Sequence, residues 1–132
     1  MKENVIQEKT FWFAVRIIKL YKYLCAEHKE FVLSKQILRS GTSIGSNVQA
    51  SIGGQSEKDF LHKISIAYKE ARETAYWLRL LKETEYINQD EFSSLFVDSD
   101  EICKILGSIQ IAIKKKIGYW NFKKRKILVS TS

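Results

Sequence analysis

Not one proline interrupts the 132 residues of this chain. Proline in a helix interior costs about 3 kcal/mol, because it removes a backbone hydrogen bond and clashes with the preceding turn. Its absence therefore favours long, unbroken helices. Four segments also repeat apolar residues every three or four positions, which is the period of an amphipathic α-helix. We expect an all-α fold, an antiparallel up-down-up-down four-helix bundle over residues 1–117, with a basic, aromatic C-terminal tail at 118–132.

The first segment carries an apolar stripe that predicts one buried face of a helix. The stripe has a three-four spacing and consists of Phe11, Ala14, Ile18, Tyr21 and Cys25, with Ile17 and Leu24 widening it. Thr10 or Asn4 is suited to cap the start of this helix, because short polar side chains accept hydrogen bonds from free backbone N–H groups. We expect the helix to end near residues 27–29.

Local start signals mark the other three helices. Ser56 stands three residues before Asp59, and Asn88 stands three residues before Glu91, which are both capping-box patterns. Ser34 is suited to cap the second helix. These signals place turns near residues 30–33, 53–56 and 84–88, and they predict a fourth helix over residues 89–117.

The second segment places Gly41 and Gly45 on or beside its apolar stripe. Each glycine costs about 1 kcal/mol relative to alanine in a helix interior, so a compensating interaction is needed. A phosphate-binding loop would require G-x-x-x-x-G-K-[ST], or G-x-G-x-x-G after a strand, and neither pattern is present. We expect instead a helix whose missing side chains let a neighbouring helix approach closely. That neighbour lies either in the same chain or in another subunit.

Cysteine and histidine are the residues that metal or acid–base chemistry would use first. Cys25 and His28 share one helical face, as do Asp59 and His62, and these ligand types suit zinc. In an up-down bundle the two pairs lie at opposite ends of helices about 30 Å long, so they do not meet within one chain. Cys103, like Cys25, is expected to pack as a small hydrophobe. We therefore expect a protein with no enzymatic activity, bound metal or cofactor. Of the alternative functions, a metal-dependent enzyme is the least favoured.

The positive charge is concentrated near the C-terminus. The chain has 22 basic and 15 acidic residues, and seven of the basic ones fall between residues 114 and 126 with no acid among them. Basic side chains neutralise phosphates and aromatic ones stack on exposed bases, so this segment predicts binding to nucleic acid, with RNA or single strands favoured. The residues expected to do so are Lys114, Lys115, Lys116, Tyr119, Trp120, Phe122, Lys123, Lys124, Arg125 and Lys126. Three other roles for this segment stay open. It could bind an anionic membrane surface, act as a solubilising tail, or pack on the bundle or on a neighbouring subunit.

Two motifs together resemble one known family. They are RSGTSIG at residues 39–45, followed by Asn47, and KEARET at residues 69–74, followed by YWL at residues 76–78. AVRIIKLYKYL in the first segment fits the same pattern. On these motifs, residues 8–113 resemble the 23S rRNA intervening-sequence proteins, once called ribosomal protein S23.

The resemblance implies a bacterial up-down bundle that assembles as a homopentamer, in a family whose members mostly have no assigned activity. It also implies similarity to the accessory variability determinant of diversity-generating retroelements, a basic, nucleic-acid-binding partner of a reverse transcriptase. The basic stretch from Lys114 onward lies outside the motifs, so what the family implies does not cover it.

The resemblance also bears on the glycine-containing helix. It fits a polar strip facing another helix or subunit, so the expected helix-packing or subunit interface is Arg39, Gly41, Thr42, Ser43, Gly45, Asn47 and Glu70. Two outcomes are equally expected for Glu70. Its carboxylate either forms an ion pair with Arg39 or Arg72, or it is an ordinary solvent-exposed charge. For Glu73 we favour a solvent-exposed pair with Lys69, worth a few tenths of a kcal/mol.

No apolar run approaches the ~20 residues needed to cross a bilayer, and the N-terminus lacks the features of an export signal. We therefore expect a cytoplasmic location. The leading hypothesis is a non-enzymatic, oligomeric helical bundle that binds nucleic acid through a basic surface and tail. The main alternative is a protein–protein adaptor or scaffold, for example accessory to a reverse transcriptase, without direct nucleic-acid binding.

Overall fold

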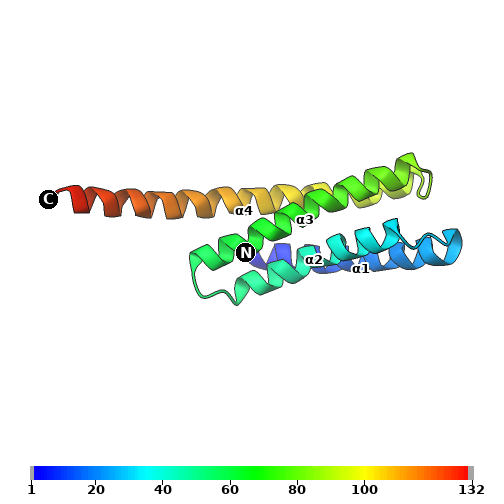
Figure 1. The fold of residues 1–132 in the computed structure, drawn as a ribbon, viewed down its shortest axis with the longest axis horizontal. Helices are drawn as coiled ribbons and strands as arrows, with labels where there is room; N and C mark the ends of the chain where they lie inside the picture. Colours follow the sequence, from blue (N-terminus) through cyan, green and yellow to red (C-terminus); the bar gives the residue numbers. More distant parts are fainter. Residues whose placement is uncertain (1, 131–132) are drawn as a thin grey trace.

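Four α-helices make up the part of the chain that the structure describes. The computed structural model describes the backbone of residues 2–130 and the side chains of residues 5–118. The helices are α1 (Lys2–His28), α2 (Leu33–Ile52), α3 (Glu57–Glu83) and α4 (Gln89–Ser130), and no strand occurs within residues 2–130. They run alternately in opposite directions along one long axis (Figure 1). The predicted all-α, up-down-up-down bundle is therefore confirmed.

The turns between the helices match the local signals closely. α1 ends at His28, and the turns occupy residues 29–32, 53–56 and 84–88. The Asp59 backbone N–H donates to Ser56 Oγ over 3.1 Å. At the start of α4, the Glu91 N–H donates to Asn88 Oδ1 over 2.8 Å, and the Asn88 N–H donates back to Glu91 Oε1 over 3.0 Å. Both predicted caps are confirmed, because each depends only on residues three positions apart.

The start of α2 differs from the expectation. Ser34 lies inside the helix and is buried, so it does not cap it. The carboxylate of Glu30 takes that role and accepts backbone N–H groups of Val32, Leu33 and Ser34, each over 2.8 Å. Burial by itself raises the pKa of Glu30, but the three donors outweigh burial and lower the pKa below its usual value.

The buried face of α1 is also turned relative to the predicted stripe. Ile17 and Leu24 are fully buried as expected, but Phe11 is 58% exposed and Ile18 is 40% exposed. Thr10, expected as a possible cap, is buried inside the helix and donates its hydroxyl to the Ile6 carbonyl over 2.7 Å. Asn4 likewise lies within α1 rather than at its start. The error arose because α1 carries two apolar faces, and the helical period cannot say which of them meets the bundle.

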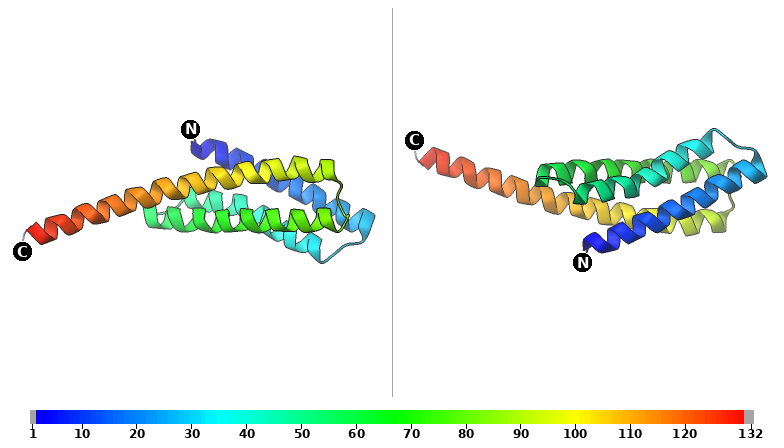
Figure 2. Two further views of the ribbon diagram at one scale, coloured as in Figure 1. Left: turned by 90° about the horizontal axis from the view of Figure 1, so that it is seen from above. Right: turned by 90° about the horizontal axis from the view of Figure 1, so that it is seen from below.

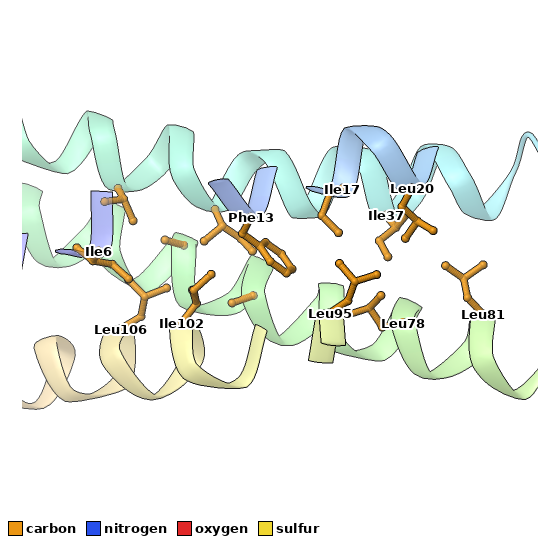
Figure 3. Packing of buried hydrophobic residues seen from close by; sticks show 14 of the residues in the cluster. Ile6, Phe13, Ile17, Leu20, Ile37, Leu78, Leu81, Leu95, Ile102 and Leu106 are labelled. Carbon is orange, nitrogen blue, oxygen red and sulfur yellow. The ribbon is translucent and has the colours of Figure 1, made fainter. Parts of the chain in front are cut away.

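One apolar cluster joins all four helices. Its side chains point toward one another between the helix axes (Figure 3). The labelled members are Ile6, Phe13, Ile17 and Leu20 of α1, Ile37 of α2, Leu78 and Leu81 of α3, and Leu95, Ile102 and Leu106 of α4. Two ion pairs also cross from α1 to α4, Lys9–Glu101 at 2.7 Å and Arg16–Asp98 at 2.6 Å. This core holds the outer helix faces in fixed positions.

Helix α4 is longer than expected. The sequence predicts an end near residue 117, but the helix continues to Ser130. Its C-terminal part projects well past the turn between α2 and α3 (Figures 1 and 2). A single Gly118 costs only about 1 kcal/mol and does not end the helix. Among the described residues, no helix is both long and apolar enough to cross a membrane.

Candidate functional site

The glycines of α2 lie against α1 of the same chain. A Cβ atom on Gly41 would stand 2.8 Å from both Cγ1 and Cγ2 of Ile17, and one on Gly45 would stand 3.2 Å from the Thr10 carbonyl oxygen. Neither glycine is in a loop, because α2 is continuous from Leu33 to Ile52. The close neighbour that the sequence left open is therefore α1 of the same chain.

The polar residues beside the glycines bond to their own helix. Thr42 donates to the Leu38 carbonyl over 2.7 Å, and Asn47 donates to the Ser43 carbonyl over 2.9 Å. Ser43 itself donates to the Ser40 carbonyl over 3.0 Å. These three side chains are partly exposed. Their donor groups therefore serve α2, and within the described residues none of them binds a neighbouring helix.

Arg39 links α2 to α3 through two carboxylates. One of its guanidinium nitrogens lies 3.2 Å from Glu70 Oε2, and the other lies 2.5 Å from Glu73 Oε1. The surface pair expected between Glu73 and Lys69 is thus wrong, because Glu73 turns toward α2 and also accepts the Trp77 indole N–H over 3.3 Å. Burial alone raises the pKa of Glu73, but the hydrogen bond from Arg39 is among the contacts that lower it overall.

The cysteine and histidine pairs lie far apart, as the topology predicts. Cys25 and His28 are at the end of α1, while Asp59 and His62 are at the start of α3, and Figure 1 shows these at opposite ends of the bundle. His28 instead packs edge-on between the rings of Tyr23 and Tyr86, with centroid distances of 5.3 and 5.4 Å. Over the described side chains, no three potential metal ligands come together.

A cleft of about 630 Å³ opens between α1 and the start of α4. Arg16 lies in its wall and donates to Ser94 Oγ over 2.7 Å and to the Asp98 carboxylate over 2.6 Å. Neither histidine and neither cysteine lines this cleft. Arg16 is thus engaged in joining two helices.

The predicted basic residues lie on the part of α4 that leaves the bundle. Lys114, Lys115 and Lys116 are exposed. Lys116 pairs with Glu57 of α3 over 2.5 Å, whereas Lys114 and Lys115 have no ion pair among the described side chains. The other predicted members lie on the helical backbone of α4, and their side chains fall outside the described residues: Tyr119, Trp120, Phe122, Lys123, Lys124, Arg125 and Lys126.

A second basic surface on α3 escaped the sequence reasoning. Between Phe60 and Lys82, the exposed side chains of α3 are His62, Lys69, Arg72, Tyr76 and Arg79. We call these five residues the α3 row. They are separated by seven, three, four and three positions, so they follow one face of the helix. This spacing is visible in the sequence, but only the structure shows that the face points outward.

Comparison with known proteins places the chain in a family of unknown function. The 23S rRNA-intervening sequence protein family matches residues 2–108, which leaves the whole basic segment at residues 114–126 outside the match. One similar solved structure is a protein of unknown function from the S23 ribosomal protein family of Bacteroides thetaiotaomicron VPI-5482. It is 56% identical, covers 86% of this chain and 99% of its own, and superposes with a TM-score of 0.82. No curated protein matches. This chain belongs to the 23S rRNA-intervening sequence protein family.

Proposed function

We propose that this protein is a non-enzymatic bundle that binds nucleic acid through the basic end of α4. The observation that carries the proposal is the distribution of charge. Seven of the 22 basic residues fall between residues 114 and 126, and the remaining 15 equal the number of acidic residues. The helix that carries this charge projects beyond the bundle, so a polyanion can approach it from several sides (Figure 2).

A salt titration of RNA or single-stranded DNA binding tests this proposal. Up to seven phosphate contacts per chain at the basic end of α4 contribute a magnitude near ~5 to the log–log slope on a single strand, because each contact releases counterions. Truncation after Ile113 should reduce the magnitude of the slope by about 5, because it removes these contacts, with circular dichroism as the control that the bundle still folds. Unchanged binding by that folded truncation would contradict the proposal. Binding to a protein partner that survives nuclease and high salt would instead favour an adaptor.

We also propose that the bundle self-associates through the exposed apolar face of α1. Phe11 and Ile18 lie two turns apart on this face, with Val15 half-buried between them. Exposed apolar side chains that gather on one face are typical of interfaces. A second copy is the occupant we propose, because the family resemblance implies a homo-oligomer, and five subunits is the number it implies. Several copies would gather their basic helices and strengthen binding by avidity.

Replacing Phe11 and Ile18 with glutamine is expected to lower the oligomer mass. Glutamine keeps the helix, because its helix propensity is high, but it removes the apolar surface. Sedimentation or light scattering measures the mass of the double variant and of Val97→Gln, a matched control on an exposed apolar residue of α4. If both variants keep the mass of the unmodified protein, another surface holds the copies together.

A further inference from the structure

The α3 row offers a line of cations along the outside of the bundle. Lys69, Arg72 and Arg79 are exposed, and no described ion pair engages any of them. From His62 to Arg79 the row spans about 26 Å at the rise of an α-helix. It is therefore long enough to follow several phosphates of one strand.

The carboxylates of α3 between Lys69 and Glu83 pair with cations outside the row. Glu70 and Glu73 of α3 bind Arg39 of α2, and Glu83, which follows Arg79 by one turn on the same face, pairs with Lys82 over 3.7 Å. Asp100 of α4 is 2.9 Å from Lys104. The cations of the row consequently face solvent without a carboxylate among the exposed residues between them, which favours an anionic ligand.

Tyr76 adds an exposed aromatic ring to the cations of the row. Its side chain is 54% exposed, and it stands between Arg72 and Arg79 along the same face. The Trp77 ring meets it edge-on at a centroid distance of 5.4 Å, and the Trp77 N–H is itself bonded to Glu73. An exposed aromatic ring held between cations is the arrangement that stacks on an unpaired base while its neighbours bind phosphates.

We propose that the α3 row is a binding site for single-stranded nucleic acid, separate from the basic end of α4. Lys69, Arg72 and Arg79 contact the phosphates, and Tyr76 stacks on a base. A duplex keeps its bases inside the helix, so it gains the phosphate contacts but not the stacking. This inference rests on the proposed function, which it extends to different residues and to a preferred ligand.

The test uses the full chain and a fluorescently labelled 20-nucleotide single strand, with the matching duplex beside it. Replacing Lys69, Arg72 and Arg79 with glutamine should reduce the magnitude of the log–log salt slope by about 2, because three single-strand contacts are lost. The matched control replaces Lys19, Lys22 and Lys35, which are exposed on α1 and α2, with glutamine. It removes the same charge and should leave the slope unchanged. Equal effects of the two triple variants would overturn the proposal.

Tyr76 variants separate stacking from charge. Tyr76→Ala should weaken single-strand binding about tenfold and leave duplex binding unchanged, because one stacked base is lost. Tyr76→Phe should bind the single strand as the unmodified chain does, because it keeps the ring. Equal losses on single strand and duplex, or no loss on either, would show that Tyr76 does not stack.

The same measurements separate this inference from the proposed function. If truncation after Ile113 removes all binding while the α3 variants change nothing, the α3 row is not a binding site and the basic end of α4 is. If the α3 variants bind less while the folded truncation binds normally, the α3 row is the binding site and the basic end of α4 is not. A third arm uses vesicles containing anionic lipid. Loss of vesicle binding by the α3 variants, with oligonucleotide binding intact, would make the row a membrane contact and overturn the proposal.

Discussion

Replacing Gly41 with valine should lower the free energy of unfolding by about 3 kcal/mol, because inserted carbons overpack a filled core. The added Cβ would stand 2.8 Å from two carbons of Ile17, and Ile17 is fully buried, so it has no free volume to move into. The gain in helix propensity from glycine to valine is a few tenths of a kcal/mol and does not offset the clash. Urea unfolding followed by circular dichroism measures the difference.

Gly118 provides a matched control for this substitution. It also lies inside a helix, but a Cβ atom there would meet nothing within 4 Å. Gly118→Val should leave the stability unchanged or slightly raised. A double variant of Gly41→Val with Ile17→Ala should lose less than the sum of the two single losses, because the alanine makes room for the valine. Strictly additive losses would show that the two residues do not press on each other.

The pattern of helices was predictable because it depends on short sequence separations. The capping boxes at Ser56 and Asn88 connect residues three positions apart, and the apolar period needs only one or two turns to show itself. Gly41 was recognisable as a site of close approach for the same reason. The partner of that approach was not, because Ile17 lies 24 positions earlier in the chain and only the fold brings it to α2.

The candidate site was predictable in its charge but not in its geometry. The cluster from Lys114 onward could be counted in the sequence, yet its continuation as one helix to Ser130 could not be foreseen from the composition. The α3 row was overlooked because its residues are mixed with Glu70 and Glu73, which make the segment look like evenly distributed surface charge. Arg39 draws both carboxylates toward α2, and this tertiary contact leaves the outer face basic.

The buried cap of α2 makes Glu30 the second residue with a large expected effect. Glu30→Ala should lower the free energy of unfolding by about 3 kcal/mol at pH 7, because three backbone N–H groups at the start of α2 lose a charged acceptor. Glu30 is only 9% exposed, so water replaces these hydrogen bonds poorly. Glu27→Ala on the exposed surface of α1 is the control and should change stability little.

The dependence on pH distinguishes the charge of Glu30 from its packing. The folded protein lowers the pKa of Glu30, so the carboxylate contributes its full stability above the unfolded pKa of about 4.3. That contribution is lost as the pH falls through the lower, folded pKa. The stability difference between the unmodified chain and Glu30→Ala should therefore shrink between pH 7 and strongly acidic pH, as measured by urea unfolding at each pH. If the difference stays constant over this range, the stability lost in Glu30→Ala comes from packing, because packing contacts do not depend on the ionisation of the carboxylate.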